Sequence, residues 1–442
     1  MARSDRFRST ASTMGRALRH RNYRLFFFGQ GTSLVGTWLT RVAMSWLVYR
    51  LSGSELLLGL VGFAGQIPMF LLAPFAGVVA DRVDRRRLLV VTQVLALLQS
   101  ALLAVLTIAG VITVAQVAVL AVFQGVINAF DMPARQAFVV QMVEAREDLG
   151  NAIALNSSMV NGARLLGPAL AGILIALVGE GWCFAIDAAS YLAVIASLLA
   201  MRIAVARPPA EPTGYLTELR EGFRYVASFA PVRAMLLLLA CTSLTGMPYV
   251  VLMPVFAGEV LHGGPHTFGL LMACSGAGAL SAAIWLASRR TILGLDRVIW
   301  VAASGFGLAL CTFSLSRSVW LSAPLLAVAG GSMMLQMASS NTLVQTLVDE
   351  RLRGRVMSFY VVAFLGMMPF GSLGAGWLGE RIGAPATVGL GGAATLAAAV
   401  TFASALPRLR AVMHPIYSRL GILPEAAEGL AGTTGAHEPP AR

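Results

Sequence analysis

The chain has 442 residues, of which 57% are hydrophobic and 12% are charged, whereas soluble proteins carry about 25% charged residues. This composition excludes a disordered chain and disfavours a water-soluble globule. The net charge of +12 is typical of nucleic-acid binders, but all 33 basic residues are arginines and most lie between long apolar runs, which disfavours that class. Because lysine is absent, a phosphate-binding loop of the ATPase type is also excluded. We therefore expect neither nucleic acid nor nucleotide as a partner.

Twelve apolar segments are each long enough to cross a bilayer as a helix, which takes about 20 residues. They predict an all-α integral membrane protein with twelve transmembrane helices. The segments cover residues 25–49, 56–80, 88–109, 113–132, 151–178, 182–201, 234–256, 268–287, 297–315, 320–345, 356–378 and 385–406.

The arginines are distributed unevenly between the two sides of the predicted membrane. All but five lie in the tails and loops on one side; the exceptions are Arg41, Arg50, Arg164, Arg317 and Arg381. The positive-inside rule places the arginine-rich side in the cytoplasm, so we expect both termini to be cytoplasmic in a cell (inner or plasma) membrane. The first 24 residues also fit an organelle transit peptide, but a basic cytoplasmic tail explains them more simply.

The longest gap between segments, residues 202–233, divides them into six and six. Its apolar residues recur at helical spacing, which predicts an amphipathic helix on the membrane surface. We therefore expect a cytoplasmic tail over 1–24, a six-helix bundle over 25–201, a cytoplasmic linker over 202–233, a second six-helix bundle over 234–406 and a disordered cytoplasmic tail over 407–442.

A faint internal repeat relates the two predicted bundles at a constant offset of 204 residues. Secondary transporters are commonly built from two related halves around a site at the bilayer midplane. The repeat therefore predicts two pseudo-symmetric bundles. Gln141, Gly150, Gly162, Gly167, Ala171, Gly172 and Gly179 recur as Gln345, Gly354, Gly366, Gly371, Ala375, Gly376 and Gly383.

The loop after the second segment carries a glycine, an Asp-Arg pair and a basic cluster: Gly77, Asp81, Arg82, Arg85 and Arg86. We expect Gly77 to let the second and eleventh helices approach closely, and Asp81 to accept hydrogen bonds from a helix N-terminus and nearby arginines. This order of residues resembles the G-x-x-x-D-R-x-G-R-[RK] motif of the major facilitator superfamily, although Asp84 stands at its second glycine. The resemblance implies a transporter of two six-helix bundles.

The fifth segment carries a second motif, made of Gly162, Gly167, Pro168 and Gly172. Its small residues and its proline predict a bendable helix that a partner helix can approach closely. It is similar to the G-x-x-x-G-P-x-x-G antiporter motif of the same superfamily, with Gly162 one position early. Residues 36–41 and 135–156 resemble, more loosely, the branch of enterobactin exporters and macrolide-efflux proteins. These resemblances imply export driven by exchange; a packing helix without functional direction is the alternative.

Three ionisable residues, Arg41, Arg164 and Asp187, lie inside predicted helices, where charge is costly and usually functional. At a rise of about 1.5 Å per residue, all three fall in the outer half of the membrane. We hypothesise that they form one charge cluster in which Asp187 carries the coupling proton. A static ion pair that only orients the helices is the alternative.

Asp131 and Arg135 lie four residues apart, on one face of the fourth predicted helix. If the neighbouring elements pack as the resemblance implies, Asp131 reaches the arginines of the 81–87 loop. It would then form a latch that breaks when the inner side opens. Direct proton transport by Asp131 is the alternative.

Neutral polar residues and methionines are the candidates for the wall of a substrate cavity, because the second bundle contains almost no buried charge. Methionine offers an adaptable surface suited to bulky apolar compounds. The candidates are Gln30, Trp38, Gln124, Asn128 and Asn161 in the first bundle and Thr242, Thr245, Tyr249, Met334, Gln336, Met337, Asn341 and Met367 in the second, with Ser243, Met333, Ser339 and Met368 beside them.

Together these features predict a secondary active transporter that works by alternating access. It would export a hydrophobic or amphipathic small molecule, such as a drug, siderophore or secondary metabolite, in exchange for protons. An importer or lipid flippase of the same fold remains open, as do a membrane sensor and an integral membrane enzyme from different classes. The four cysteines are widely separated and no catalytic motif is visible. We therefore expect no enzyme activity, no cofactor and no metal; the expected partners are membrane lipid, the substrate and protons.

Overall fold

Helices make up almost all of the described chain. The computed structural model describes residues 16–143, 145–202, 215–289 and 291–420. The first half holds six long helices, with single turns η1 (Arg16–Arg19) before the first and η2 (Arg146–Asp148) before the fifth. The long helices are α2 (Arg21–Ser52), α3 (Glu55–Arg82), α4 (Arg85–Ile108), α5 (Val114–Met142), α6 (Leu149–Val178) and α7 (Glu180–Ala200).

The second half also makes six crossings within the described residues, and two of them are broken by π-helical turns. Pro248 and Pro369 follow two of these turns, and proline cannot donate the backbone hydrogen bond of a regular helix. The crossings are α9 (Ala230–Cys241), η3 (Thr242–Gly246), α10 (Tyr249–Val255) and η4 (Phe256–Val260); α11 (Pro265–Ser288); α12 (Leu295–Leu315); α13 (Val319–Leu347); α14 (Glu350–Val361), η5 (Val362–Gly366) and α15 (Met368–Ile382); and α16 (Ala384–Arg419).

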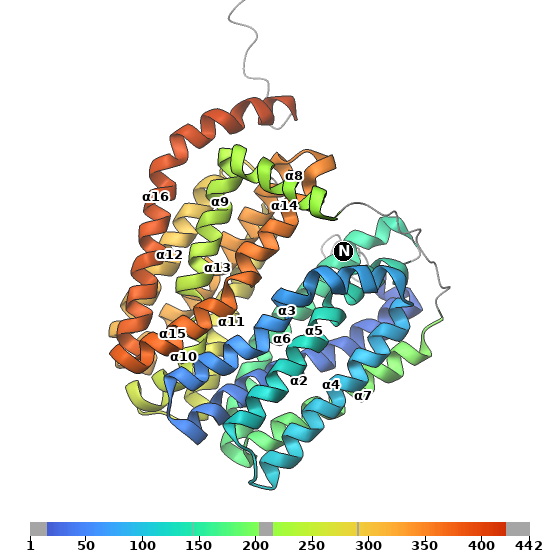
Figure 1. Cartoon of the computed structure of the whole chain (residues 1–442), viewed down its shortest axis with the longest axis vertical. Helices are drawn as coiled ribbons and strands as arrows, with labels where there is room; N and C mark the ends of the chain where they lie inside the picture. The colour runs from blue at the N-terminus through green and yellow to red at the C-terminus, as the bar shows by residue number, and fades with distance from the viewer. Residues whose placement is uncertain (1–15, 144, 203–214, 290, 421–442) are drawn as a thin grey trace, which may run out of the picture.

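Eleven of these crossings are long and apolar enough, within the described residues, to be recognised as membrane spans from length and composition. α2 is the twelfth. Polar residues such as Gln30 and Arg41 lower its hydropathy, but its 32 residues rise by about 48 Å, which exceeds the bilayer core of about 30 Å. The predicted all-α membrane fold with two six-helix bundles is confirmed (Figure 1).

The last helix is longer than the sequence predicted. α16 continues to Arg419, so the expected disordered tail over 407–442 begins too early, and of that range only 421–442 lie outside the described residues. Leu409 and Met413 are buried against the second bundle, and Arg410 donates a hydrogen bond to Asp296 of α12. These contacts stabilise the helix beyond the predicted boundary.

The linker between the halves contains the short helix α8 (Tyr215–Ser228). Glu221 of α8 pairs with Arg355 of α14, and Gly222 lies against Phe359. Residues 203–214 of the linker lie outside the described residues. The linker therefore ends docked on the second bundle.

The helices begin and end at two opposite faces of the protein, which we call the basic end and the closed end. The basic end holds the starts of α2, α4, α6, α9, α12 and α14, and the closed end holds the starts of α3, α5, α7, α11, α13 and α16. Figure 1 shows the two bundles spread apart at the basic end, near α8 and α14, and meeting at the closed end, where α10 and α15 lie beside α3.

Two pairs of glycines let helices from opposite bundles touch. Gly59 of α3 faces Gly376 of α15, and a Cβ on Gly376 would lie 2.7 Å from the Cα of Gly59. Gly172 of α6 faces Gly269 of α11, and a Cβ on Gly172 would lie 2.9 Å from the Cα of Gly269. Because carbon atoms that are not bonded do not approach so closely, both crossings require glycine.

The internal repeat of the sequence corresponds to repeated packing. Gly172 and Gly376, which are 204 residues apart, both lie at the crossings between the bundles. Gly167 packs against Trp38 of α2, and its repeat Gly371 packs against a backbone carbonyl of η3, in the first crossing of the second half. Equivalent glycines therefore make equivalent contacts in the two bundles.

Gly77 and Gly162 do not make the close contacts that the motifs predicted. A Cβ on either residue would meet no atom within 4 Å, so Gly77 does not bring α3 against α15 in this conformation. Gly77 lies near the basic end of α3, where the bundles are apart, whereas Gly162 lies at the middle of α6. α3 and α15 instead touch at Gly59 and Gly376, toward the closed end.

Substitution of Gly376 by alanine should destabilise the contact between the bundles. We expect Gly376→Ala to lower the apparent thermal unfolding midpoint of the purified protein, because overpacking costs about 1–3 kcal/mol. Gly374→Ala is the matched control, since a Cβ on Gly374 of the same helix meets no atom within 4 Å. Equal midpoints for the two variants would show that the crossing does not require glycine.

Candidate functional site

A cavity of about 770 Å³ lies between the two bundles. Its wall extends from Leu58, near the closed end of α3, to Ser358 of α14, nearer the basic end. Small-molecule sites typically enclose about 300–1,000 Å³, so the cavity has the size of a site for an organic ligand.

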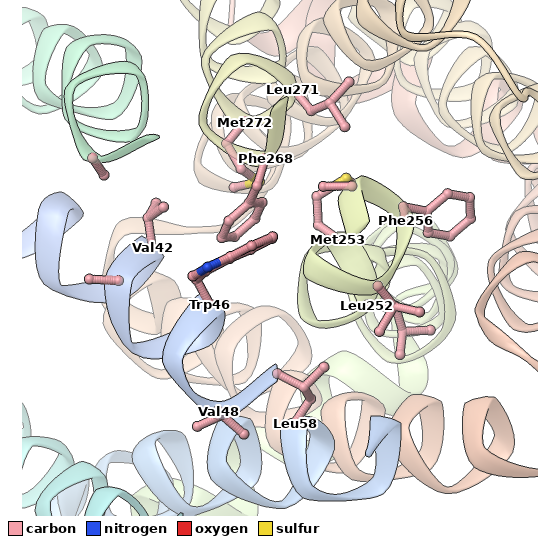
Figure 2. Close-up of a cluster of buried hydrophobic side chains, with 14 of the residues drawn as sticks. Val42, Trp46, Val48, Leu58, Leu252, Met253, Phe256, Phe268, Leu271 and Met272 are labelled. Carbon is pink, nitrogen blue, oxygen red and sulfur yellow. The ribbon is translucent and has the colours of Figure 1, made fainter. Parts of the chain in front are cut away.

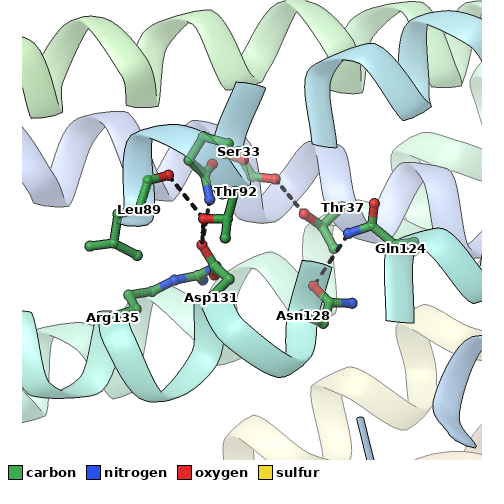
Figure 3. A network of polar contacts seen from close by, with 9 residues as sticks. Ser33, Thr37, Leu89, Thr92, Gln124, Asn128, Asp131 and Arg135 are labelled. Atoms are coloured by element: carbon green, nitrogen blue, oxygen red, sulfur yellow. Dashed lines mark hydrogen bonds and ion pairs between the residues drawn. The ribbon is translucent and has the colours of Figure 1, made fainter. Parts of the chain in front are cut away.

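The cavity brings together predicted residues that are far apart in the sequence. Trp38, Gln124, Asn128 and Tyr249 line it, as do the three predicted charged residues Arg41, Arg164 and Asp187. Gln124 donates a hydrogen bond of 3.3 Å to Asn128 of the same helix (Figure 3). Tyr249 and Ser275 share a hydrogen bond of 2.9 Å between their hydroxyls, which fixes the tyrosine ring in the wall.

The other nine predicted cavity residues do not line this cavity. Several of them join helices within one bundle: Gln336 donates a hydrogen bond of 2.9 Å to Thr242, and the hydroxyls of Thr245 and Thr395 lie 3.2 Å apart. Helical spacing predicts the depth of such residues but not which way their helix faces. The nine are Gln30, Asn161, Thr242, Thr245, Met334, Gln336, Met337, Asn341 and Met367.

Methionines do contribute to the wall, but mostly from positions other than the predicted ones. Met44, Met69, Met132, Met247 and Met272 line the cavity together with Met368, and Phe70 and Phe268 add aromatic surface. Met44 could have been predicted from its spacing, because it lies three residues after Arg41 and therefore on the same face of α2. The wall is therefore largely apolar and adaptable.

Asp187 is buried in the wall of the cavity, with 1% of its surface exposed. Its Oδ2 accepts hydrogen bonds from Thr40 (2.7 Å) and Ser100 (2.9 Å), which lie on α2 and α4. Its Oδ1 has no hydrogen-bond partner in the described structure. Arg41 interacts electrostatically with both Asp187 and Arg164. The three residues predicted to lie at one level therefore share one cavity. Asp187 is held there by neutral hydrogen-bond donors and not by a direct ion pair.

Asp131 forms the centre of a second buried polar cluster (Figure 3). Its Oδ1 accepts hydrogen bonds from Thr92 (2.9 Å) and Gln93 (2.8 Å) of α4, and its Oδ2 pairs with Arg135. The predicted latch between Asp131 and the 81–87 loop is not formed in this conformation. Thr92 and Gln93 lie about 10 Å deeper along α4 than Arg86, so Asp131 is too far from the loop.

One basic residue of the loop, Arg86, binds the first bundle instead. Arg86 donates hydrogen bonds to the backbone carbonyls of Leu198 (2.8 Å) and Leu199 (2.7 Å), near the end of α7. Asp84, which replaces the second glycine of the motif, caps the N-terminus of α4 by accepting a hydrogen bond from the backbone N–H of Arg86. Arg82 is exposed, and the side chain of Asp81 lies outside the described residues.

Two carboxylates join the bundles at the closed end by capping helices of the opposite bundle. Glu380 of α15 accepts hydrogen bonds from the Ser54 hydroxyl (2.9 Å) and the Leu56 N–H (3.1 Å), at the start of α3. Glu55 of α3 accepts a hydrogen bond of 3.1 Å from the N–H of Ala384, the first residue of α16. Free N–H groups and the helix dipole stabilise a carboxylate at a helix N-terminus. This reciprocal capping holds the closed end together.

Aromatic contacts add to the closure beneath these caps. Trp46 of α2 stacks on Phe268 of α11, with 6.1 Å between the ring centroids. Figure 2 shows these two rings facing each other between helices of the two bundles, among Val42, Met253 and Met272. The cavity is thus closed on this side by buried apolar side chains.

Comparison with known proteins decides the family. Residues 12–420 match the model of the transmembrane secretion effectors, a family of the major facilitator superfamily. The chain belongs to this family. The predicted superfamily and branch are confirmed, and this family member is a membrane transporter of small molecules and not an enzyme.

Characterised relatives of this transmembrane secretion effector are aligned over most of its length. It is 25% identical to the Staphyloferrin A transporter of Staphylococcus aureus, over 86% of this chain and 95% of that protein. It is 26% identical to the multidrug efflux pump Tap of Mycolicibacterium fortuitum, over 82% and 90%, and 22% identical to macrolide efflux protein A of Streptococcus pyogenes, over 83% and 92%. The crystal structure of a mutant of the nucleoside transporter NupG shares its fold, with a TM-score of 0.68 at 13% identity over 88% of this chain and 99% of that one.

Neutralisation of Glu380 should open the closed end of the transporter. We expect Glu380→Gln to lengthen the distance between spin labels placed at Val111 and Trp320, which are exposed at that end of the two bundles, because the amide carries no charge for the helix N-terminus. Double electron–electron resonance measures this distance in a variant whose native cysteines have been replaced. Glu180→Gln is the control, since Glu180 pairs with Arg50 within the first bundle. An unchanged distance in Glu380→Gln, or an equal change in the control, would contradict the capping role.

Proposed function

We propose that this transporter exports a hydrophobic or amphipathic small molecule from the cytoplasm in exchange for protons. The observation that carries the proposal is the cavity between the two bundles, closed at one end and with the bundles apart at the other. A site that opens to one face at a time is what alternating access requires. The relatives named as efflux pumps support the direction.

The basic end of the protein is assigned to the cytoplasm. It carries the loop arginines Arg82, Arg85, Arg86 and Arg87, and cytoplasmic loops are enriched in basic residues. On this assignment the described conformation is inward-open, ready to accept substrate from the cytoplasm. Both termini would then be cytoplasmic, in the plasma membrane.

Asp187 is our candidate for the proton carrier. It is the one carboxylate among the described residues of the cavity wall, its Oδ1 has no hydrogen-bond partner, and its other partners Thr40 and Ser100 are neutral. An ionised carboxylate in this setting is costly unless the nearby charge of Arg41 compensates it. Protonation therefore changes the charge of the cluster, and this change biases the equilibrium between the inward-open and outward-open forms.

Tyr191 suggests a route from Asp187 toward the basic end. Tyr191 lines the cavity wall one helical turn after Asp187 on α7, toward the basic end, and Arg135 of α5 lies near it. Arg135 in turn pairs with Asp131. These residues would form a polar path through the otherwise apolar first bundle, with Asp131 and Arg135 responding to the opening of the basic end instead of carrying the proton.

The experiment that tests the proposal is efflux of a panel of fluorescent and antibiotic compounds from cells that express the full chain. Expressing cells should accumulate less of the exported compounds than cells without the chain, and collapse of the proton gradient should abolish the difference. Higher accumulation in expressing cells would indicate import. Equal accumulation of every compound would refute export.

Asp187→Asn should uncouple export from the proton gradient. Because asparagine cannot carry a proton, we expect export against a gradient to fall by about tenfold or more and to lose its dependence on external pH. Asp296→Asn is the control, since Asp296 pairs with Arg410 away from the cavity. If Asp187→Asn exports with an unchanged pH profile, Asp187 only orients helices.

A further inference from the structure

The charges in the cavity wall do not balance. Arg41, Arg164 and Asp187 are the only charged residues among the described residues that line the cavity. Arginine stays protonated in proteins, so the wall carries more positive than negative charge even when Asp187 is ionised. In a cavity at membrane depth, such an excess of charge is costly unless a ligand or water compensates it.

The two arginines are available to a ligand, whereas Asp187 is not. Asp187 is 1% exposed and its Oδ2 already accepts two hydrogen bonds. Arg41 is exposed although it lies in the interior of α2, so its accessible surface faces the cavity. Its guanidinium lies over the Trp38 ring, 5.0 Å from the centroid. Among the described residues, no side-chain or backbone oxygen accepts a hydrogen bond from Arg41 or Arg164.

The two guanidiniums also repel each other, since Arg41 interacts electrostatically with Arg164 across the same cavity. An anion placed between two guanidiniums relieves this repulsion and accepts charge-assisted hydrogen bonds from both. Apolar side chains make up much of the rest of the wall, and Met44, Met272 and Phe268 are among them. The complementary ligand therefore combines a negative group with an apolar body.

We propose that the cavity takes an amphipathic organic anion, with a carboxylate or similar group bound by Arg41 and Arg164 and an aromatic or aliphatic body packed against the methionines and Phe268. The inference rests on the proposed export function and narrows its substrate class. It excludes lipophilic cations as the preferred substrates, because both arginines repel them.

Two dyes with one ring system and opposite charge test the proposal. Carboxyfluorescein is an anionic xanthene and rhodamine 6G a cationic one, so the two share a ring system and carry opposite charge. Bacterial cells that lack their main exporters are loaded with each dye, and efflux is followed with and without expression of the full chain. We expect expression to accelerate the loss of carboxyfluorescein and to leave that of rhodamine 6G unchanged.

Variants of the two arginines identify the site. Arg41→Gln and Arg164→Gln should each slow carboxyfluorescein export by about tenfold, as expected for loss of a charge-assisted hydrogen bond. Arg41→Lys and Arg164→Lys keep the charge and should retain more export than the glutamine variants. Arg50→Gln is the matched control, since Arg50 pairs with Glu180 at the closed end and does not line the cavity. Export is normalised to the amount of folded protein in the membrane.

The outcomes separate this inference from the proposed function. If neither dye leaves the cells faster on expression, the proposed export function fails and the substrate class fails with it. If rhodamine 6G is exported and carboxyfluorescein is not, export stands and the anionic class is wrong. If carboxyfluorescein is exported equally by the wild type and both glutamine variants, the anion does not bind between these arginines. Should one glutamine variant not fold, the other and the lysine variants decide.

Discussion

The structure depends on backbone contact between the bundles at glycines. At Gly59 with Gly376, and at Gly172 with Gly269, no side chain separates the two helices, so the bundles touch without interlocking side chains. Such contacts can act as pivots, because the helices can tilt about them without displacing a side chain that is packed between them. Both pairs lie toward the closed end, and the reciprocal caps of Glu55 and Glu380 lie beyond them. Closure at one end therefore leaves the other end free to spread.

The two bundles share this frame but differ in chemistry. Every charged residue that lines the cavity within the described chain comes from the first bundle, on α2, α6 and α7. The second bundle supplies the two crossings broken by π-helical turns, and Met247 and Gly366 beside these breaks line the same cavity. We infer a division of labour in which the first bundle provides charge recognition and the second provides an apolar, deformable wall. Transport then requires the two to move relative to each other.

Much of the fold could be predicted from the sequence, because the length of each apolar segment shows where the chain crosses the membrane. The rise per residue of a helix then gives the depth of each residue in the membrane. This explains why Arg41, Arg164 and Asp187 were expected at one level. Rotation about a helix axis is not fixed in this way, so Thr242 and Gln336 were predicted in the cavity but join helices of one bundle. Contacts between residues that are far apart in the sequence could not be predicted either. No motif includes Gly59, and the hydrogen-bond donors of Asp131 lie on α4. The motif glycine Gly77 makes no close contact in the conformation described.

We infer that the closed end must open for transport to occur. Cysteines at Ser54 and Glu380, whose side chains are hydrogen-bonded at 2.9 Å across the bundles, can be joined by oxidation or a short thiol cross-linker in a background without native cysteines. Cross-linking should abolish efflux, and reduction of the cross-link should restore it. Undiminished efflux with the two positions fully cross-linked would contradict alternating access through this cavity.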